Sequence, residues 1–298
     1  MSVNGRLTVA VLGPGGVGGL LAGLLARGGH RVVCLAGEET AGALRDGGIR
    51  VRSGQHGDFH VAVEAATRLA DAPDLVLVAV KETALREALE RVPADVLRDD
   101  TLVVPLLNGI EHLELLRERY GTGRVAAGVI RVEATRVAPG VIEHGTPFTE
   151  VELAGPEALR ARLEALAGVL RGVGVGVSVG QDVAAALWGK LALLAPFALL
   201  TTRYGLPVGE VRVERRDELV AAVGEAVAVA RAAGVSLDPE AVMARYDAFP
   251  AATKSSMQRD AEAGRLLEVD AVGGALLRAA ERHSVPVPVL SRLVREIG

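Results

Sequence analysis

A glycine cluster near the N-terminus is the first pattern in the sequence that indicates chemistry. Gly13-Pro14-Gly15-Gly16-Val17-Gly18 satisfies G-x-G-x-x-G, between the apolar run Leu7–Leu12 and the helical stretch Val17–Arg27. In this strand–turn–helix context the glycines allow a tight turn, a close approach of pyrophosphate to the backbone, and close packing of helix on strand. The free N–H groups at the helix start then point at the phosphates. The alternative is a glycine-rich turn that binds no ligand. The residues predicted to bind the dinucleotide are Gly13, Gly15, Gly16, Val17 and Gly18.

The end of the second predicted strand, Arg31–Leu35, should select the dinucleotide. An acidic residue there binds the ribose diol of NAD, whereas an arginine accepts the 2′-phosphate of NADP. The segment continues as Ala36-Gly37-Glu38-Glu39, with no arginine beside it in the sequence. Glu38 or Glu39 could favour NADH, or both could be solvated charges at a helix start. The cofactor is therefore predicted as NADP or NAD.

One lysine interrupts the most apolar segment of the chain. Lys190 is the only charged residue between Ala184 and Leu200. Burial among apolar groups lowers the pKa of a lysine toward the range in which it gives up a proton at neutral pH, so Lys190 is a candidate general acid. The alternative is a lysine whose stem only covers apolar surface. A central lysine would cost about 2.5–3.5 kcal/mol in a membrane, and Pro196 breaks the regular helix, so we expect a buried helix of a soluble protein.

The elements that position these residues alternate between strand-like and helix-like segments over the first 180 residues. Asp74–Val80 is continuous and apolar, as is typical of a parallel strand covered on both faces. This alternation predicts an α/β fold whose N-terminal part is a Rossmann-type dinucleotide-binding domain. The other predicted strands and helices of this part are Leu102–Pro105, Thr83–Arg91, Pro156–Leu170 and Gly174–Val179.

Two changes of pattern follow along the chain. Strand-like runs between Gly123 and Leu153, separated by Pro and Gly turns, predict an antiparallel extension of the sheet. From Gln181 on, strand signals end, and Pro286 and Pro288 indicate a connection. We therefore expect a dinucleotide-binding domain at 1–180 and an all-helical substrate and catalytic domain at 181–298. The helices expected there are Ala184–Thr201, Glu210–Ala233, Pro239–Phe249, Ser255–Ala263 and Glu268–His283.

Composition excludes several classes of function. The chain has 298 residues and a net charge of −4, without a basic run, which argues against nucleic acid as a partner. A single cysteine, Cys34, excludes an intrachain disulfide, and the N-terminus lacks a signal-peptide pattern, so a cytoplasmic protein without a membrane partner is expected. His56 and His60 lie four apart, but Gly57 between them disfavours a helical metal pair, and no metal is predicted.

Several segments together resemble the ketopantoate reductases (2-dehydropantoate 2-reductases) nearly end to end. They are VLGPGGVGGLLAGLLARGGHRVVCLA, DLVLVAVKET, LLNGIE, PGVIEHG, WGKLA, SSMQRDAEAGRLLEVDAVGG and HSVPVP. The resemblance implies NADPH-dependent reduction of a 2-oxo acid to a 2-hydroxy acid in pantothenate biosynthesis, with the substrate in a cleft between domains. It also implies a possible homodimer.

The resemblance carries over residue by residue. Lys190 matches the family's catalytic lysine, the proton donor, and Lys81 and Asn108 match residues near nicotinamide and substrate. Ser256 and Glu268 match substrate-binding and catalytic positions, with Glu268 also near the cofactor. From the residues alone, other interpretations stay open. Lys81 could be a surface lysine, Asn108 part of a turn, Ser256 or its neighbour a helix cap, and Glu268 an acidic first-turn residue.

Four positions depart from the family's pattern. Four and eight residues after Lys190 the family usually has asparagines that bind the substrate, and here these are Leu194 and Ala198. Both lie on roughly the lysine's helix face, so the substrate is expected to be less hydroxylated or bulkier than ketopantoate. Gly37 stands where the family has an arginine for the 2′-phosphate, and Gly273 where it has an asparagine.

Three functions remain open on this basis. The first is a reductase of a 2-oxo acid or related small-molecule carbonyl. The second is a family paralogue that acts on a less polar or bulkier carbonyl in specialised biosynthesis. The third is a non-redox protein that only binds a dinucleotide, which would need neither Lys190 nor Glu268.

Overall fold

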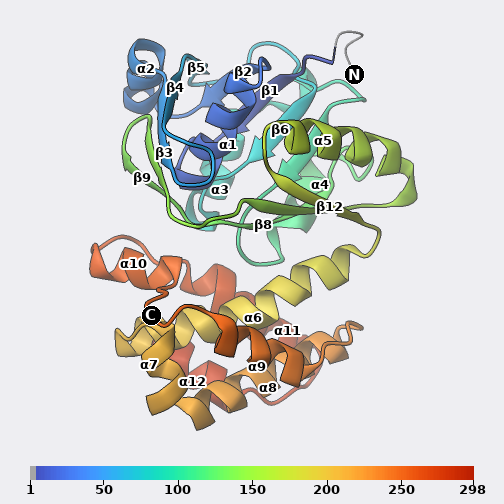
Figure 1. The fold of residues 1–298 in the computed structure, drawn as a ribbon. Coiled ribbons are helices and arrows are strands. Elements are labelled where there is room, and N and C mark those ends of the chain that lie inside the picture. Colours follow the sequence, from blue (N-terminus) through green and yellow to red (C-terminus); the bar gives the residue numbers. More distant parts are fainter. Residues whose placement is uncertain (1–4) are drawn as a thin grey trace. The chain divides into compact units, whose positions relative to one another are not determined.

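The computed structural model describes residues 5–298, which pack into two compact units (Figure 1). One, here called the α/β unit, contains residues 5–107 and 112–183. The other, the helical unit, contains residues 108–111 together with 184–298. The short segment 108–111 thus belongs to the helical unit although the sequence around it belongs to the α/β unit. The predicted division at residue 180 remains a prediction about independently folding domains.

A five-stranded, all-parallel sheet forms the centre of the α/β unit, in the order β5-β2-β1-β6-β7. Every residue of β6 and β7 is buried, as expected of apolar strands covered on both faces. The predicted Rossmann-type α/β fold is confirmed. The five strands are β1 (Thr8–Leu12), β2 (Arg31–Leu35), β5 (Glu64–Ala66), β6 (Leu75–Val78) and β7 (Leu102–Pro105).

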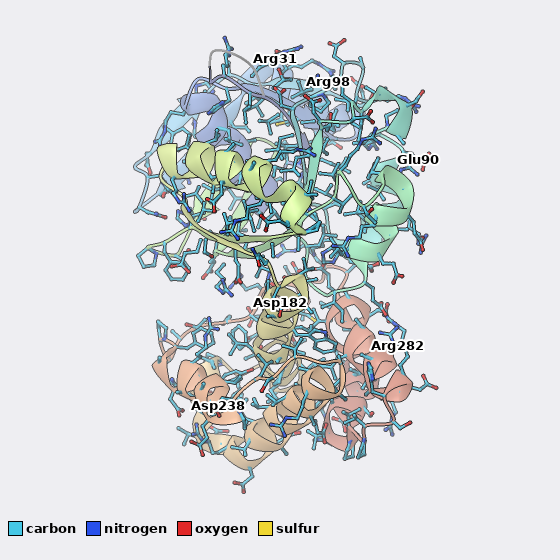
Figure 2. The ribbon with its side chains drawn as sticks, turned by 90° about the vertical axis from the view of Figure 1, so that its right-hand side faces the viewer. Arg31, Glu90, Arg98, Asp182, Asp238 and Arg282 are labelled. Carbon is cyan, nitrogen blue, oxygen red and sulfur yellow. The ribbon has the colours of Figure 1, made fainter. Side chains whose placement is uncertain are left out.

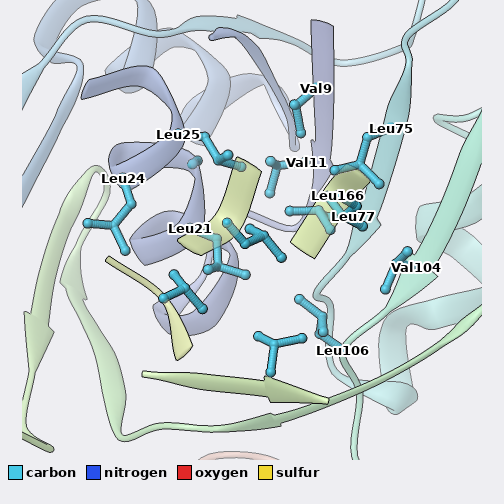
Figure 3. Packing of buried hydrophobic residues seen from close by; sticks show 14 of the residues in the cluster. Val9, Val11, Leu21, Leu24, Leu25, Leu75, Leu77, Val104, Leu106 and Leu166 are labelled. Atoms are coloured by element: carbon cyan, nitrogen blue, oxygen red, sulfur yellow. The ribbon is translucent and has the colours of Figure 1, made fainter. Parts of the chain in front are cut away.

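The main core of this unit lies between the sheet and two helices, α1 (Gly16–Arg27) and α5 (Arg160–Gly172). Figure 3 shows Val9 and Val11 of β1 beside Leu21 of α1 and Leu166 of α5. Aliphatic side chains from these three elements thus fill one space with almost no aromatic rings.

Helix α1 also packs against a second sheet, and glycines make this possible. A Cβ on Gly19 would lie 2.6 Å from Ile142, and one on Gly23 would lie 3.2 Å from Ile49. Gly16 comes closest, because its Cβ would lie 2.0 Å from the backbone oxygen of Ala134. These three glycines lie on one helix face, so α1 is held between two sheets.

The strands after residue 123 do not extend the parallel sheet as predicted. They belong to a four-stranded sheet, β4-β3-β10-β9, and a three-stranded sheet, β12-β11-β8. Neither is purely antiparallel, since β10 pairs with β3 and β11 with β12 in parallel. An isolated bridge between Val103 and Val125 is the link between β7 and the chain entering β8. The strands are β3 (Ile49–Ser53), β4 (Phe59–Val61), β8 (Ala127–Arg131), β9 (Ala134–Ala138), β10 (Val141–His144), β11 (Glu150–Ala154) and β12 (Gly176–Gly180).

Shorter helices complete the α/β unit. Helix α2 packs on β2 and β5, and α4 packs on β7. The predicted helix Thr83–Arg91 is a 3₁₀ turn followed by the short α3. Charged side chains such as Glu90 and Arg98 project outward (Figure 2). The bounds are α2 (Glu38–Gly47), η1 (Glu82–Ala84), α3 (Leu85–Leu89), η2 (Ala94–Val96), α4 (His112–Tyr120) and η3 (Glu157–Leu159).

The helical unit is built around α6 (Val183–Tyr204). Among residues 5–298 this is the one helix long and apolar enough to cross a membrane, and 61% of its most apolar window is buried inside the protein. It runs through Pro196 without a break, contrary to expectation. The hydroxyl of Tyr246 donates a hydrogen bond to the backbone oxygen of Leu193, and this contact supports the turn that contains the proline.

The remaining helices surround α6 and differ from prediction in two places. The expected helix Glu210–Ala233 is divided at Arg215, and the expected connection around Pro288 instead begins a final helix. Proline is well suited to that first position because it has no N–H to leave unsatisfied. The bounds are α7 (Val208–Glu214), α8 (Arg216–Ala232), α9 (Pro239–Ala248), α10 (Ser256–Glu262), the π-helix η4 (Asp270–Gly274), α11 (Ala275–Arg282) and α12 (Pro288–Ile297).

Candidate active site

The glycine loop has the geometry that each glycine of the motif predicts. Gly13 has a positive φ of 85°, and a Cβ there would lie 2.4 Å from Val80, just beyond the end of β6. A Cβ on Gly18 would lie 2.2 Å from the backbone oxygen of Gly13 and 3.1 Å from Ala79, so α1 packs tightly on β1 and β6. A Cβ on Gly15, in contrast, would meet nothing within 4 Å. Gly15 is therefore the one open position of the motif.

This open position lies where a dinucleotide phosphate can bind. Gly15 is the N-cap of α1, and no side chain caps the helix, so its first N–H groups are available to an anion. Strands β1 and β6 are neighbours whose chain connections leave in opposite directions, which makes this the switch point of the sheet. The residues present therefore fit a pyrophosphate.

Three other predicted cofactor residues lie in or beside the loop, in different surroundings. Gly16 is fixed by its packing on Ala134, which explains its small size without a ligand. Val17 is half-buried against the core, and Lys81 is half-buried directly after Val80. Lys81 thus directly follows Val80, the residue that a Cβ on Gly13 would meet.

At the end of β2, the predicted acidic selectors of the ribose lie in the first turn of α2. The Glu38 carboxylate accepts a hydrogen bond of 2.5 Å from Arg45 in the same helix, and Glu39 is exposed. An arginine is present nearby after all, although it is distant in sequence. Nη2 of Arg91 lies 3.9 Å from where a Cβ on Gly37 would be.

In the helical unit, Lys190 is half-buried on α6, between the buried Trp188 and Leu191. Besides Lys190, the only charged residue of this helix is Arg203, which binds Glu296 at 2.6 Å. One basic side chain is therefore presented on an otherwise apolar stretch.

The two departures on this helix differ in burial. Leu194 is half-buried, whereas Ala198 is only 1% exposed. Direct contact of Ala198 with a substrate would require its neighbours to move. Of these two replacements for the family's asparagines, Leu194 is therefore the one expected to affect substrate binding directly.

Asn108 and Glu268, predicted from distant parts of the sequence, lie together. The Asn108 amide donates a hydrogen bond of 3.4 Å to the Glu268 carboxylate. Gly109 has a φ of 86°, and a Cβ there would lie 2.4 Å from the backbone oxygen of Ala271. The Asn-Gly pair is therefore a turn, as the alternative held, and it also positions Asn108 against Glu268.

Arg278 connects segment 108–111 with the start of η4. Arg278 donates to Glu111 at 2.7 Å and to Asp270 at 2.7 Å. The carboxylates of Glu111 and Asp270 raise the pKa of Arg278 above its usual range. Segment 108–111 is thus bound to the helical unit by charge as well as by packing.

The two serines before α10 have different surroundings. Ser255 is buried, caps α10 by accepting from the N–H of Gln258 at 3.0 Å, and accepts a hydrogen bond from Thr201. Ser256 is exposed. The capping alternative therefore applies to Ser255, which leaves Ser256 accessible to a ligand.

Gly273, which stands where the family has an asparagine, is explained by close packing. A Cβ on Gly273 would lie 2.4 Å from Val294 of α12. An asparagine would therefore not fit here unless α12 moved away from η4.

The histidines considered for metal binding take part in other contacts. His56 shares a hydrogen bond with Thr149 at 3.1 Å, and His60 donates to the backbone oxygen of Gly47 at 2.6 Å. Within residues 5–298, no group of three or more His, Cys, Asp or Glu side chains could hold a metal ion.

A Rossmann-type sheet with an open glycine loop, in one chain with a helical unit that carries a lone lysine on its core helix, defines the class of two-domain nicotinamide-dependent oxidoreductases. Comparison with known proteins specifies the family. Residues 9–154 match the family model "Ketopantoate reductase PanE/ApbA", and residues 182–298 match the model of its C-terminal part. The chain belongs to the ketopantoate reductase family.

Individual relatives agree with this assignment. A 2-dehydropantoate 2-reductase of Halobacterium salinarum is 32% identical, over 96% of each chain. A PanE/ApbA family ketopantoate reductase of Ralstonia eutropha has a solved structure with a TM-score of 0.87 and 30% identity, over 97% of each chain. The solved D-mandelate dehydrogenase with NADH and anilino(oxo)acetate has a TM-score of 0.90 over 97% of each chain, but at 21% identity it shows the shared fold alone.

These relationships make the chain an NAD(P)-dependent oxidoreductase that acts on a small molecule. The predicted family, fold class, enzyme class and cofactor class are confirmed.

Proposed function

We propose that this chain reduces the carbonyl of a 2-oxo acid to a 2-hydroxy acid and that Lys190 donates the proton. The observation that carries the proposal is the position of Lys190, a half-buried cation on the apolar core helix α6. Reduction of a carbonyl places negative charge on its oxygen, and a nearby ammonium both stabilises that charge and supplies the proton. The nicotinamide supplies the hydride.

The residues of the α/β unit would hold the dinucleotide. The N–H groups that follow Gly15 would donate to the pyrophosphate, and Lys81 beside the loop would add positive charge. These residues bind and orient, and they take no part in proton transfer.

The remaining predicted residues would bind and orient the substrate in this proposal. Asn108 has a second amide hydrogen beyond the one donated to Glu268, and it can donate this hydrogen to the substrate. The hydrogen bond to Glu268 fixes the orientation of that amide. Ser256 is exposed at the start of α10 and can bond to a substrate carboxylate or hydroxyl.

A second candidate, a paralogue acting on a less polar or bulkier carbonyl, is favoured by Leu194. Its half-buried aliphatic side chain lies one turn from Lys190 and offers no hydrogen bond. A substrate whose corresponding part is apolar gains from this contact, and a hydroxylated one loses an interaction. In either case we propose a cytoplasmic enzyme without nucleic-acid or membrane partners, as a homodimer.

The test is carbonyl-dependent consumption of NADH and NADPH, measured by absorbance with ketopantoate and with bulkier, less polar 2-oxo acids. Lys190→Met retains the aliphatic stem but not the charge, and we expect kcat to fall by about 10²–10⁴-fold. Arg295→Met, which removes an exposed cation of α12, is the matched control. Turnover of only the bulkier acids would favour the second candidate. A protein that binds dinucleotide but oxidises it with none of these carbonyls would contradict both.

A further inference from the structure

Arg91 presents a guanidinium at the surface of the α/β unit, just after α3. Its Nη1 donates a hydrogen bond of 3.0 Å to the backbone oxygen of Thr67. Its Nη2 points toward Gly37, 3.9 Å from where a Cβ on that glycine would be. Within residues 5–298, no carboxylate forms an ion pair with Arg91. One end of this guanidinium is therefore anchored and the other is available.

The anchor lies at the carboxyl end of two paired strands. Leu35 of β2 pairs with Ala66 of β5, and the N–H of Ala36 donates to the backbone oxygen of Ala66 at 3.1 Å. Thr67 directly follows β5, and Gly37 follows Ala36 after the end of β2, so both lie at the same edge of the sheet. In this fold class, the end of β2 is where the adenosine ribose of the dinucleotide binds.

The charges at this edge leave the guanidinium uncompensated. Glu38 is engaged by Arg45, which also donates to the backbone oxygen of Ala65 at 3.3 Å. Glu39 is exposed in the first turn of α2. Gly37, the N-cap of α2, is exposed and has no side chain that could cover Arg91. An anion approaching Gly37 would meet the unbonded side of Arg91 first.

We infer that Arg91 binds the 2′-phosphate of NADPH and gives this chain a preference for NADPH over NADH, an inference that rests on the function proposed above. Arginine binds phosphate with several charge-assisted hydrogen bonds in a planar arrangement. The family's arginine at position 37 is replaced by Gly37 in this chain. Arg91, which follows α3, places its guanidinium beside that position instead. Gly37 has no side chain that could bond to Nη2 of Arg91, so this side of the guanidinium remains available to a phosphate.

The test measures the binding of NADP⁺ and NAD⁺ by titration calorimetry, without turnover. We expect the wild-type chain to bind NADP⁺ more tightly than NAD⁺. Arg91→Gln should weaken NADP⁺ binding about tenfold to a hundredfold and leave NAD⁺ binding unchanged. Arg86→Gln removes the same charge from an exposed position of α3 and is the matched control.

A second pair of variants leaves Arg91 and its anchor intact. Gly37 has a φ of −64°, so other residues fit there, and both Asp and Asn cap a helix well. Gly37→Asp would place a carboxylate beside Arg91 and should weaken NADP⁺ binding selectively, whereas Gly37→Asn should not. Equal loss of both dinucleotides in Arg91→Gln, or no selective loss in Gly37→Asp, would overturn the inference.

The two proposals fail in distinguishable ways. A wild-type chain that prefers NAD⁺ and reduces a 2-oxo acid with NADH would overturn the role of Arg91 but leave the proposed reaction intact. A chain that binds neither dinucleotide would overturn both.

Discussion

The glycine loop and the lysine helix differ in what builds them. The loop site consists of backbone, and its glycines follow one another within six residues of sequence. The site proposed in the helical unit consists of side chains from α6, α10 and segment 108–111 together with Glu268. The Asn108–Glu268 hydrogen bond joins positions 160 residues apart. Backbone sites are determined locally, whereas side-chain sites depend on the packing of the whole unit.

The difference matters for which substitutions are tolerated. At the loop, dinucleotide binding requires that no side chain be present. Any added side-chain atom is therefore expected to weaken binding. In the helical unit, one side chain can replace another, and the departures Leu194 and Ala198 lie there. The comparison leads to four predictions, given from the largest expected effect to the smallest.

The first prediction separates ligand binding from folding within the loop. Gly15→Val should weaken dinucleotide binding by about 100-fold or more, because its side chain takes the space of the pyrophosphate and several charge-assisted hydrogen bonds are lost. Its thermal stability should change little, since no atom lies within 4 Å of a Cβ there. Gly18→Ala should lose binding and also about 1–3 kcal/mol of stability, because its Cβ would overlap the Gly13 oxygen. Calorimetry and thermal unfolding measure the two effects.

If Gly15→Val were as destabilised as Gly18→Ala, the open position at Gly15 would have a structural role. Gly15 would then no longer be an example of a loop position that serves ligand binding alone.

The second prediction concerns Asn108 and Glu268. Each of Asn108→Ala and Glu268→Gln should lower kcat/KM about tenfold, since each disturbs the same oriented amide. In a double-mutant cycle the two effects should fall short of additivity by about 1 kcal/mol. Ser255→Ala, which removes the cap of α10 and the acceptor of the Thr201 hydroxyl, should lower stability and leave kcat/KM of the folded enzyme unchanged. Fully additive losses at Asn108 and Glu268 would mean that the two residues act separately.

The third prediction tests the apolar face of α6. Leu194→Asn should improve kcat/KM for a hydroxylated 2-oxo acid, relative to an apolar one, by about tenfold, the effect of one hydrogen bond. Leu193→Asn introduces the same amide at an adjacent half-buried position on a different helix face. Equal changes for both substrates, or the same shift from Leu193→Asn, would remove Leu194 from the substrate site.

The fourth prediction concerns the acid stability of the α/β unit. Burial, and then Arg6, lower the pKa of His30 below its ordinary 6.5, and its Nδ1 accepts a hydrogen bond from the N–H of Leu7. Burial also lowers the pKa of His56, with added contributions from His144 and Arg27. Since the unfolded state binds protons more readily, the stabilisation is complete above pH 6.5 and is lost as the pH falls through the lowered values.

Urea unfolding between pH 7 and 5 measures this effect. Circular dichroism reports on both units, whereas fluorescence of Trp188, the chain's single tryptophan, reports on the helical unit. Acid should shift the dichroism midpoint more than the fluorescence midpoint, and His30→Gln, which still offers an acceptor, should reduce the shift. A larger shift in fluorescence would place the acid-sensitive groups in the helical unit.

The parts of the fold that the sequence predicted well are those fixed by local pattern. Strands β2 and β7 have their predicted bounds, and the glycine motif lies at the expected strand–helix junction. The small strands β3, β4, β5 and β9 were not anticipated, because they are short and are stabilised by their pairing partners rather than by their own composition. Helix α12 was missed because Pro288, its first residue, was interpreted as part of a connection.

The candidate site shows the same limit. The glycine loop could be derived from the residues, whereas Asn108, Ser256 and Glu268 came only from the family resemblance, since each has an ordinary structural explanation. Arg91 could not be found in this way, because the signal sought was an arginine beside Gly37 in the sequence. Only the pairing of β2 with β5 brings the chain near Thr67 into reach of that position.

Segment 108–111 has a consequence for the order of events during translation. The ribosome delivers Glu111 early, but its partner Arg278 follows 167 residues later. The α/β unit can acquire all its own strands once residue 183 has emerged, while this four-residue loop still lacks its binding partners. The Asn108–Glu268 pair therefore forms only after nearly the whole polypeptide has been synthesised, and a nascent chain cannot carry the complete site before then.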